Sequence, residues 1–358
     1  MTADVSERVT RKDSESENVS WKYLPESRHV MAVIVTYGAR AELLIRVLDA
    51  LRGVGITRAV VVDNGASWPV CVELTACYGD FVDVVAMGRN TGSAPGYAAG
   101  LQRALDLGAE YLFLLDDDNL PQPHAVEALL RAHDELREST PHDRLAVLAY
   151  RPEHQPDVAA GVPLWRINPR PSSFLGFHVL DIPYKLWRRT PWGRPIPPAQ
   201  LPPLVEMHMA PYSGLLLHRD AAAAIGLPRE DFVLYGDDTE WSNRIVRCGG
   251  RIVLVTAARV TDLESSWNLR QINGNSLNVL LYGENDYRVY YSTRNGAYFF
   301  SQFQVRNKIW FELNATVYQS ALYLMARLKH RGTRFALLVR AIHDGRSGAL
   351  GVSEEFPL

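Results

Sequence analysis

The chain has 358 residues, of which 38 are Lys or Arg and 40 are Asp or Glu, so its formal net charge is −2. At about 100–200 residues per domain, this length predicts two domains or one large domain with an appendage. The contents of apolar (47%) and charged (22%) residues exclude wholesale disorder. The near-neutral charge excludes a dedicated nucleic-acid binder.

Three cysteines, Cys71, Cys77 and Cys248, occur without a CxxC pair. This pattern excludes a disulfide scaffold and a zinc ribbon and is typical of a reducing compartment. We expect Cys71 and Cys77 to be buried or half-buried thiols. The sequence shows no secretory signal and no run of 18 apolar residues, so we predict a cytoplasmic protein without a membrane span.

Strands and helices alternate along the first half of the chain, after a polar tail at 1–27. Helical spacing of apolar residues predicts helices at 41–53 and 93–108, and Pro121 is expected to open another. Continuous apolar, β-branched runs predict buried strands at 30–36, 58–63, 81–87, 111–115 and 145–149. We therefore predict an α/β fold with a mainly parallel sheet flanked by helices, which binds ligands at the carboxyl ends of its strands.

The second half of the chain changes character twice. The stretch 151–211 holds 13 of the 21 prolines, so little regular structure is expected there. A strand at 212–218, two helices and a strand at 251–256 follow, and the pattern is helical from about residue 286 onward.

The strongest chemical signal is a run of three carboxylates and an amide, Asp116 to Asn119, directly after a buried strand. Adjacent unpaired charges repel each other and are costly to desolvate, and a divalent cation resolves that conflict. In an extended segment Asp116 and Asp118 point to the same side and can share a metal ion or a diphosphate. The alternative interpretation is a solvated acidic turn that caps a helix.

Three further segments carry polar residues at predicted turns. Asp237 and Asp238 begin a predicted helix, where they serve either as a cap or as a general base. The turn from Arg89 to Tyr97 contains glycines that permit close approach of a ligand, and Asp63 lies in an Asp-Asn-Gly turn. For the last two segments, an ordinary turn is the competing interpretation.

Together these segments resemble glycosyltransferase family 2, the inverting nucleotide-sugar transferases of GT-A fold, nearest the rhamnosyltransferase and galactofuranosyltransferase branch. The resemblance is carried, in order along the chain, by VIVTYGARAELLIRVLDAL, VVVDNGAS, GRNTGSAPGYAAGLQRAL, YLFLLDDDN, YSGLLLHRD and FVLYGDDTEWSNRI. It covers about residues 29–265, and YYSTRN at 290–295 with the closing LLVRAIHDGRSGALG extends it to the C-terminus. It implies a GT-A catalytic domain at 28–285, with a nucleotide-sugar-binding half at 28–150 and an acceptor half at 151–285, followed by a helical region at 286–358.

The resemblance also implies roles for single residues. Asp116 and Asp118 match the D-x-D motif that holds Mn²⁺ or Mg²⁺ on the sugar diphosphate, and Asp238 matches the catalytic base. Asp237 is expected to position the acceptor, and Trp241 to pack near the acceptor or the sugar. The implied donor pocket comprises Thr36, Tyr37, Asp63, Arg89, Asn90, Gly92 and Asp117.

One departure from the family pattern concerns the metal. Many relatives carry a histidine ligand after the strand that follows the base helix, and this chain has none there. Asp262 is a hard ligand that can replace it; alternatively metal binding is weak, or Arg259 acts on the diphosphate directly. His208 and His218 are further candidates, although a structural role is favoured for both.

The segment 287–343 holds nine Lys or Arg and one acidic residue, Glu312, among interleaved aromatic residues. Such helices either lie on an anionic membrane surface, bind an acceptor phosphate, or cap the catalytic domain with a solvated charged face. Peripheral contact with the inner face of the cell membrane and a homo-oligomer are therefore open alternatives.

We predict an inverting transferase that moves a sugar from a UDP- or dTDP-sugar to a hydroxyl group. A divalent cation on the diphosphate and an Asp base assist the transfer. The expected acceptor is a glycan, a lipid-linked glycan or a secondary metabolite. The alternatives are a sugar nucleotidyltransferase, although Thr36 to Arg40 is a poor version of its glycine-rich loop, and an inactive transferase-like binding protein.

Overall fold

The apolar runs predicted as strands form the centre of one sheet in the computed structural model, which describes residues 28–193, 197–264, 276–283 and 285–358. The predicted tail at 1–27 lies outside the described residues. The strands are β1 (Val30–Gly38), β2 (Arg58–Ala66), β3 (Val82–Ala86), β4 (Tyr111–Asp116), β5 (Asn119–Pro121), β6 (Leu145–Tyr150), β7 (Leu204–Met207), β8 (Leu215–His218) and β9 (Arg251–Asp262).

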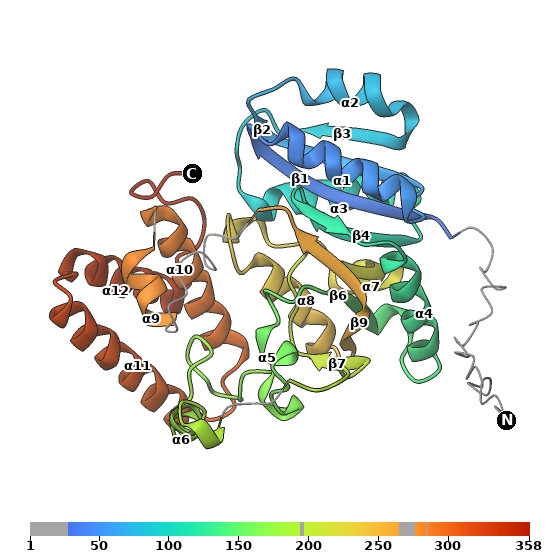
Figure 1. Cartoon of the computed structure of the whole chain (residues 1–358). Coiled ribbons are helices and arrows are strands. Elements are labelled where there is room, and N and C mark those ends of the chain that lie inside the picture. Colours follow the sequence, from blue (N-terminus) through green and yellow to red (C-terminus); the bar gives the residue numbers. More distant parts are fainter. Residues whose placement is uncertain (1–27, 194–196, 265–275, 284) are drawn as a thin grey trace, which may run out of the picture.

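Helices lie on both faces of this sheet and in a separate group at the C-terminus (Figure 1). The helices before residue 250 are α1 (Ala41–Gly53), α2 (Val70–Tyr78), α3 (Ser93–Asp106), α4 (Ala125–Arg137), α5 (Pro156–Ala159), α6 (Ile182–Trp187), α7 (Arg219–Ile225) and α8 (Asp237–Arg247). The later helices are α9 (Ser276–Tyr282), α10 (Asp286–Phe303), α11 (Lys308–Leu328) and α12 (Gly332–Ser347).

The order of the strands is β3-β2-β1-β4-β8-β6-β9-β5, and β7 pairs with β9. Strands β1 to β4 are parallel to one another, whereas β8 runs antiparallel between β4 and β6. The predicted α/β architecture of GT-A type with a helical C-terminal region is confirmed, with a sheet that is mixed rather than uniformly parallel. The hydrophobic pattern of a strand does not encode its direction, so the apolar sequence of β8 resembles that of the parallel strands although β8 is antiparallel.

Alternating side chains on the central strands feed two apolar layers. Val30, Ala32 and Ile34 of β1 pack with α1, α2 and α4 on one face of the sheet. Met31, Val33 and Val35 pack with α3, α7 and α8 on the other. Because both faces are buried, these strands are apolar throughout, as the sequence pattern indicated.

The register of the parallel strands brings the predicted polar turns to one edge of the sheet. Thr36 at the end of β1 lies opposite Asp63 of β2, and Val35 lies opposite Asp116 of β4. The three strands therefore end at nearly the same level, and the loops that follow them share one side of the molecule.

Two expectations from the sequence are wrong. Pro121 belongs to β5, an edge strand paired with β9, and α4 begins only at Ala125 after the left-handed residue His124. An edge strand tolerates a proline because the missing N–H is not needed for pairing.

The second correction concerns the cysteines. Cys71 and Cys77 are exposed rather than buried, because they lie on the outer side of α2, a helix that the sequence pattern does not predict.

The C-terminal helices pack around an apolar cluster of their own, which also takes in Phe174 from the proline-rich stretch. Asn314 of α11 ties that stretch to the helices: its Nδ2 donates to the carbonyl of Ser172 (2.8 Å), and its Oδ1 accepts from the N–H of Val179 (2.9 Å). The stretch 151–211, which has only short helices and strands, therefore joins the sheet to the helical region. The domain boundaries given above remain a proposal.

Candidate active site

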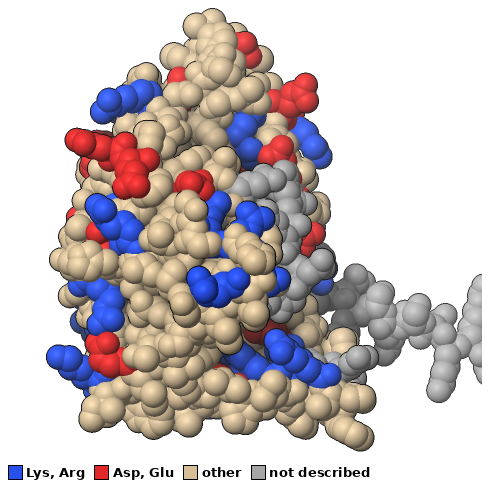
Figure 2. Space-filling model, turned by 90° about the vertical axis from the view of Figure 1, so that its left-hand side faces the viewer, with Lys and Arg blue, Asp and Glu red and all other residues tan. Residues whose placement is uncertain are grey.

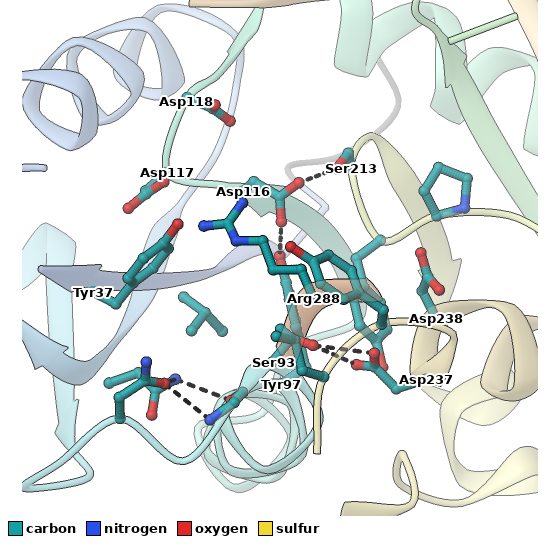
Figure 3. Close-up of a pocket in the computed structure, with 18 of the residues that line it drawn as sticks. Tyr37, Ser93, Tyr97, Asp116, Asp117, Asp118, Ser213, Asp237, Asp238 and Arg288 are labelled. Atoms are coloured by element: carbon teal, nitrogen blue, oxygen red, sulfur yellow. Dashed lines mark hydrogen bonds between the residues drawn. The ribbon is translucent and has the colours of Figure 1, made fainter. Parts of the chain in front are cut away.

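A cavity of about 560 Å³ opens at the carboxyl edge of the sheet, between the ends of β1 and β4 and the starts of α3, α8 and α10 (Figure 3). The predicted site residues that line it are Tyr37, Asn90, Gly92, Asp116, Asp117, Asp118, Asp237 and Asp238. The cavity lining does not include Thr36, Asp63, Arg89 and Asp262. The two acidic clusters, more than 110 residues apart in the chain, thus face one space.

Asp116 is held at the end of β4 by two hydroxyl groups (Figure 3). Tyr97 donates to Oδ1 over 2.8 Å, and Ser213 donates to Oδ2. The Tyr97 ring is buried and stacks on Tyr212, with 3.9 Å between ring centroids. These contacts fix the direction of the Asp116 carboxylate, which lines the cavity.

Asp117 and Asp118 share Arg40, a residue that the sequence interpretation did not single out. Arg40 forms ion pairs with Asp117 (2.8 Å) and Asp118 (3.1 Å), and Thr36 donates a hydrogen bond to Asp117 (2.7 Å). Thr36 therefore supports Asp117 from beneath the cavity. Burial raises the pKa of Asp117 to about 6 despite the opposing charge of Arg40.

Asp118 carries the clearest electrostatic conflict of this cluster. Burial and then the charge of Asp116 raise its pKa to about 7, because one guanidinium cannot neutralise three adjacent carboxylates. Carboxylate oxygens are the ligands that Mg²⁺ and Mn²⁺ prefer, and such ions take one or two of them together with substrate phosphates. The chemistry of Asp116 and Asp118 fits a divalent cation on that basis.

Asp262 is engaged elsewhere. Its Oδ1 accepts from Arg151 (2.6 Å) and Asn119 (2.8 Å), and its Oδ2 lies 2.8 Å from Nε2 of His154. Although burial acts in the opposite direction, the bond to His154 and the charge of Arg151 hold the pKa of Asp262 below its ordinary value. Across the described ranges, no group of three or more His, Cys, Asp or Glu is arranged to hold a metal ion. The structure therefore does not join Asp262 to Asp116 and Asp118 as a third ligand.

The second acidic pair begins α8. Asp237 is buried, and the hydroxyl of Ser93 donates to both of its carboxylate oxygens (3.1 Å each). Asp238 accepts from the N–H of its neighbour Thr239 (2.6 Å) and lines the cavity. Burial raises the pKa of both carboxyl groups, and the charge of Asp238 raises that of Asp237 further. Helix α8 has no side-chain cap, so neither residue is explained as a simple N-cap.

The loop before α8 takes a strained path that two other elements hold. Val233 (φ 65°) and Tyr235 (φ 63°) are left-handed, a conformation that bulky residues rarely adopt. Nδ2 of Asn295, on α10, lies 2.8, 2.9 and 2.7 Å from the carbonyl oxygens of Phe232, Leu234 and Tyr235. We call this arrangement the Asn295 clasp.

Gly92 makes the other contact with this loop. A Cβ at position 92 would lie 2.0 Å from the carbonyl oxygen of Val233, and Gly92 is itself left-handed (φ 92°). The N–H of Ala94 donates to the same carbonyl over 3.1 Å. Only glycine allows the start of α3 to approach the loop this closely.

On β2, the structure places Asn64 in the cavity lining, whereas the sequence predicted its neighbour Asp63 there. Oδ1 of Asn64 accepts from the N–H of Thr91 (2.9 Å), and its Nδ2 donates to the carbonyl of Gly92 (3.0 Å). Asp63 instead accepts from the N–H of Ala66 (2.9 Å) and closes its own turn. Successive residues of a strand point to opposite sides, which explains the exchange.

Trp241, which was expected to pack near the acceptor or the sugar, does not line the cavity. Its side chain is fully buried, and its indole N–H donates to the carbonyl of Gly226 (2.6 Å). The expected contact is therefore wrong, because Trp241 faces the apolar layer beneath α8. His208 and His218 do not line the cavity either, and His218 caps α7 by accepting from the N–H of Asp220 (3.2 Å).

The sequence interpretation also missed several residues that line the cavity. Tyr212 and Ser213 lie in the YSG motif, which was quoted for the resemblance without a role. Arg40 and Ser93 lie within quoted motifs as well, so their positions carried a signal. Arg151, His154, Tyr287 and Arg288 come from segments without a local motif, and only the fold brings them to the cavity.

The raised pKa of Asp237 predicts a dependence of stability on pH. A buried carboxyl whose pKa is higher in the folded than in the unfolded chain stabilises the fold fully below the unfolded pKa, near 4. That contribution is lost as the pH rises through the folded pKa. We expect Asp237→Asn to unfold at a higher urea concentration than the unsubstituted protein at pH 8 and to lose most of that advantage at pH 5.

Urea unfolding curves recorded between pH 5 and pH 9 measure this effect. The matched control is Asp231→Asn, in a partly exposed residue that pairs with Arg229. A gap between Asp237→Asn and the unsubstituted protein that stays constant over the whole pH range would contradict the assignment.

Comparison with known proteins bears on what this site does. Residues 31–156 match the family model described as Glycosyl transferase family 2. The chain is 27% identical to galactofuranosyltransferase GlfT1 of Mycolicibacterium smegmatis over 281 residues, which is 76% of this chain and 83% of that protein. It is 31% identical to GlfT1 of Mycobacterium tuberculosis over 232 residues, which is 62% of this chain and 65% of the relative.

Solved structures were matched at lower similarity. GalNAc-T7 with UDP, GalNAc and Mn²⁺ has a TM-score of 0.49 at 14% identity, and the match covers 82% of this chain and 54% of that chain. Residues 1–349 of S. aureus TarS give 0.42 at 11% identity, with 89% and 92% covered. The family match and the matches to GlfT1 agree, so this chain is a glycosyltransferase whose residues 31–156 match family 2 and which is similar to the galactofuranosyltransferase branch.

Proposed function

We propose that this chain is an inverting glycosyltransferase that uses a metal-bound nucleotide diphosphate sugar and an aspartate base. The observation that supports it is the meeting of two acidic clusters across one cavity, with Asp116 at the end of β4, Asp118 in the turn that follows, and Asp237 and Asp238 on α8. A single displacement needs a cation at the leaving diphosphate and a carboxylate at the attacking hydroxyl. The two clusters supply both, each from a different element.

The donor is a UDP- or dTDP-sugar in this proposal. Tyr37, Asn64 and Asn90 line the part of the cavity next to β1, β2 and the start of α3, where the base and ribose would lie. The relatives are named galactofuranosyltransferases, which favours a galactofuranosyl group as the sugar. The diphosphate would then extend toward Asp116 and Asp118.

Asp116 and Asp118 would hold Mn²⁺ or Mg²⁺, which neutralises the charge that develops on the leaving diphosphate. Phosphate oxygens would complete the coordination, since Asp262 is bound to Arg151 and His154. In this proposal the protein supplies fewer ligands than in relatives that carry the histidine, and the phosphate oxygens take the remaining positions.

Asp238 would accept the proton of the acceptor hydroxyl as that oxygen attacks the anomeric carbon. The bond from that carbon to the diphosphate oxygen breaks, and the diphosphate leaves with the electron pair. Asp237 lies deeper and is bound by Ser93, so it would orient the loop and the acceptor rather than take the proton. No covalent intermediate is needed.

The acceptor would approach from the side of the C-terminal helices. Figure 2 shows Lys and Arg side chains, interspersed with Asp and Glu, over the face that these helices form. Along α11, four apolar residues are exposed, as are the cations Lys308 and Arg327; the apolar residues are Ile309, Leu313, Leu324 and Leu328. Exposed apolar residues among cations favour contact with an anionic membrane surface that presents a lipid-linked glycan.

No helix in the described part of the chain is both long and apolar enough to cross a membrane. Peripheral membrane contact through 287–343, a cytoplasmic location and a homo-oligomer stay predictions.

The base assignment is tested with Asp238→Asn. An amide cannot accept the proton, so we expect the rate of transfer from the nucleotide sugar to fall at least about 100-fold. The Kd for the nucleoside diphosphate, measured by calorimetry, should stay within about twofold of the original value because Asp238 faces the acceptor. Asp231→Asn serves as the control, and normal turnover by Asp238→Asn would show that another group is the base.

The metal assignment is tested with a double variant, Asp116→Ala with Asp118→Ala. Calorimetric titration with UDP and with dTDP is carried out with Mn²⁺ and with a chelator. The unsubstituted protein should bind the preferred nucleotide at least about tenfold more tightly with Mn²⁺, and the variant should lose that difference. A metal dependence that survives in the variant would place the ion elsewhere.

A further inference from the structure

Three arginines line the cavity, and two of them are already paired with carboxylates. Arg40 forms ion pairs with Asp117 (2.8 Å), Asp118 (3.1 Å) and Glu264 (2.7 Å). Arg151 forms an ion pair with Asp262 (2.6 Å). These ion pairs partly neutralise both guanidinium groups, so neither is fully available to bind an anion.

Arg288, in the first turn of α10, differs from both. Among the residues that the structure describes, no carboxylate forms an ion pair with it, and its Nε donates to the hydroxyl of Tyr287 (3.1 Å). The phenols of Tyr37 and Tyr235 also lie close enough to interact electrostatically with it. Figure 3 shows its guanidinium extending into the cavity, toward the space between Tyr37 and Asp116.

The Asn295 clasp fixes where the helix that carries Arg288 lies relative to the loop before α8. Residues 288 and 295 are seven apart on α10 and therefore share one face of the helix, the face that meets the loop before α8. Asn295 holds three carbonyls of that loop, so Arg288 is held at a set position relative to Asp238. The backbone of Arg288 is thereby fixed beside the cavity, and the bond from its Nε to Tyr287 directs the side chain.

The charge of the cavity calls for such a cation. Asp116, Asp118, Asp237 and Asp238 line it, and a nucleoside diphosphate brings further negative charge into the same space. One divalent ion on Asp116 and Asp118 does not offset all of these charges. The planar guanidinium of arginine donates two parallel hydrogen bonds to phosphate oxygens, which makes it suited to a diphosphate.

We propose that Arg288 binds the diphosphate of the donor, so that the C-terminal helical region completes the donor site. This inference rests on the proposed function, because it takes its ligand to be a nucleoside diphosphate. It goes beyond that function by assigning part of the donor site to α10, which lies outside the residues 31–156 matched by the family model. The diphosphate of a lipid-linked acceptor presents the same chemistry, and the experiment separates the two sources.

The experiment compares the binding of UDP with that of uridine, or of dTDP with that of thymidine, in Arg288→Gln and Arg288→Lys. Arg288→Gln should weaken binding of the preferred diphosphate at least tenfold, which is about 1.4 kcal/mol, and leave nucleoside binding unchanged. Arg288→Lys keeps the charge but not the paired hydrogen bonds, so its loss should be smaller. The matched control is Arg219→Gln, which removes an exposed cation next to His218, whose partner Tyr111 begins β4 at the edge of the sheet opposite the cavity.

Three other outcomes would contradict either the assignment of Arg288 to the donor diphosphate or the proposed function. Unchanged diphosphate affinity in Arg288→Gln with slower transfer overturns the donor assignment and points to the acceptor's phosphate. Equal weakening of diphosphate and nucleoside overturns it as well, since it indicates a disturbed fold. If the unsubstituted protein binds neither UDP nor dTDP, the proposed function itself fails, and this inference fails with it.

Discussion

The Asn295 clasp is the contact on which the arrangement of the site depends. The loop Phe232 to Gly236 contains left-handed residues that do not favour their own conformation, so contacts from outside must hold it. The side-chain amide of Asn295 on α10 donates to three carbonyls of this loop. The carbonyl of Val233 is a fourth, and the start of α3 can approach it closely because residue 92 is glycine. The loop thereby sets the start of α8 and the positions of Asp237 and Asp238.

Charge is the second constraint. Asp117 and Asp118 of one cluster and Asp237 and Asp238 of the other are carboxyl groups whose pKa values burial raises, and the protein neutralises them only in part. A fold tolerates such a cost where function requires it. In the proposed function these carboxylates would hold the metal ion and accept the proton of the acceptor hydroxyl, so the cost of burying them would serve the chemistry.

Local sequence patterns predicted the central strands and the acidic clusters, which depend on neighbouring residues. The β-branched runs predicted the central strands, and their polar ends predicted Asp116 and Asp118 at one edge of the sheet, whereas Asp238 was predicted from a helix start and from the family resemblance. Thr36 and Asp63 were predicted to face the nucleotide, but they support Asp117 and close a turn, because strand alternation presents Asn64 to the cavity. Arg288 was predicted only as one of nine cations in 287–343, and Arg151 was not predicted, because only long-range packing brings these two residues to the cavity. Asn295 lay in a recognised motif, but its three partners are about 60 residues away.

The most direct test of this account is the turnover number of Asn295→Ala measured at saturating donor and acceptor. Asn307→Ala is the control, because Asn307 is exposed and caps α11 away from the loop. If the clasp sets the base, the turnover number of Asn295→Ala falls at least about tenfold while its circular dichroism spectrum remains that of a folded protein. A folded Asn295→Ala variant that turns over as fast as the control would contradict the account.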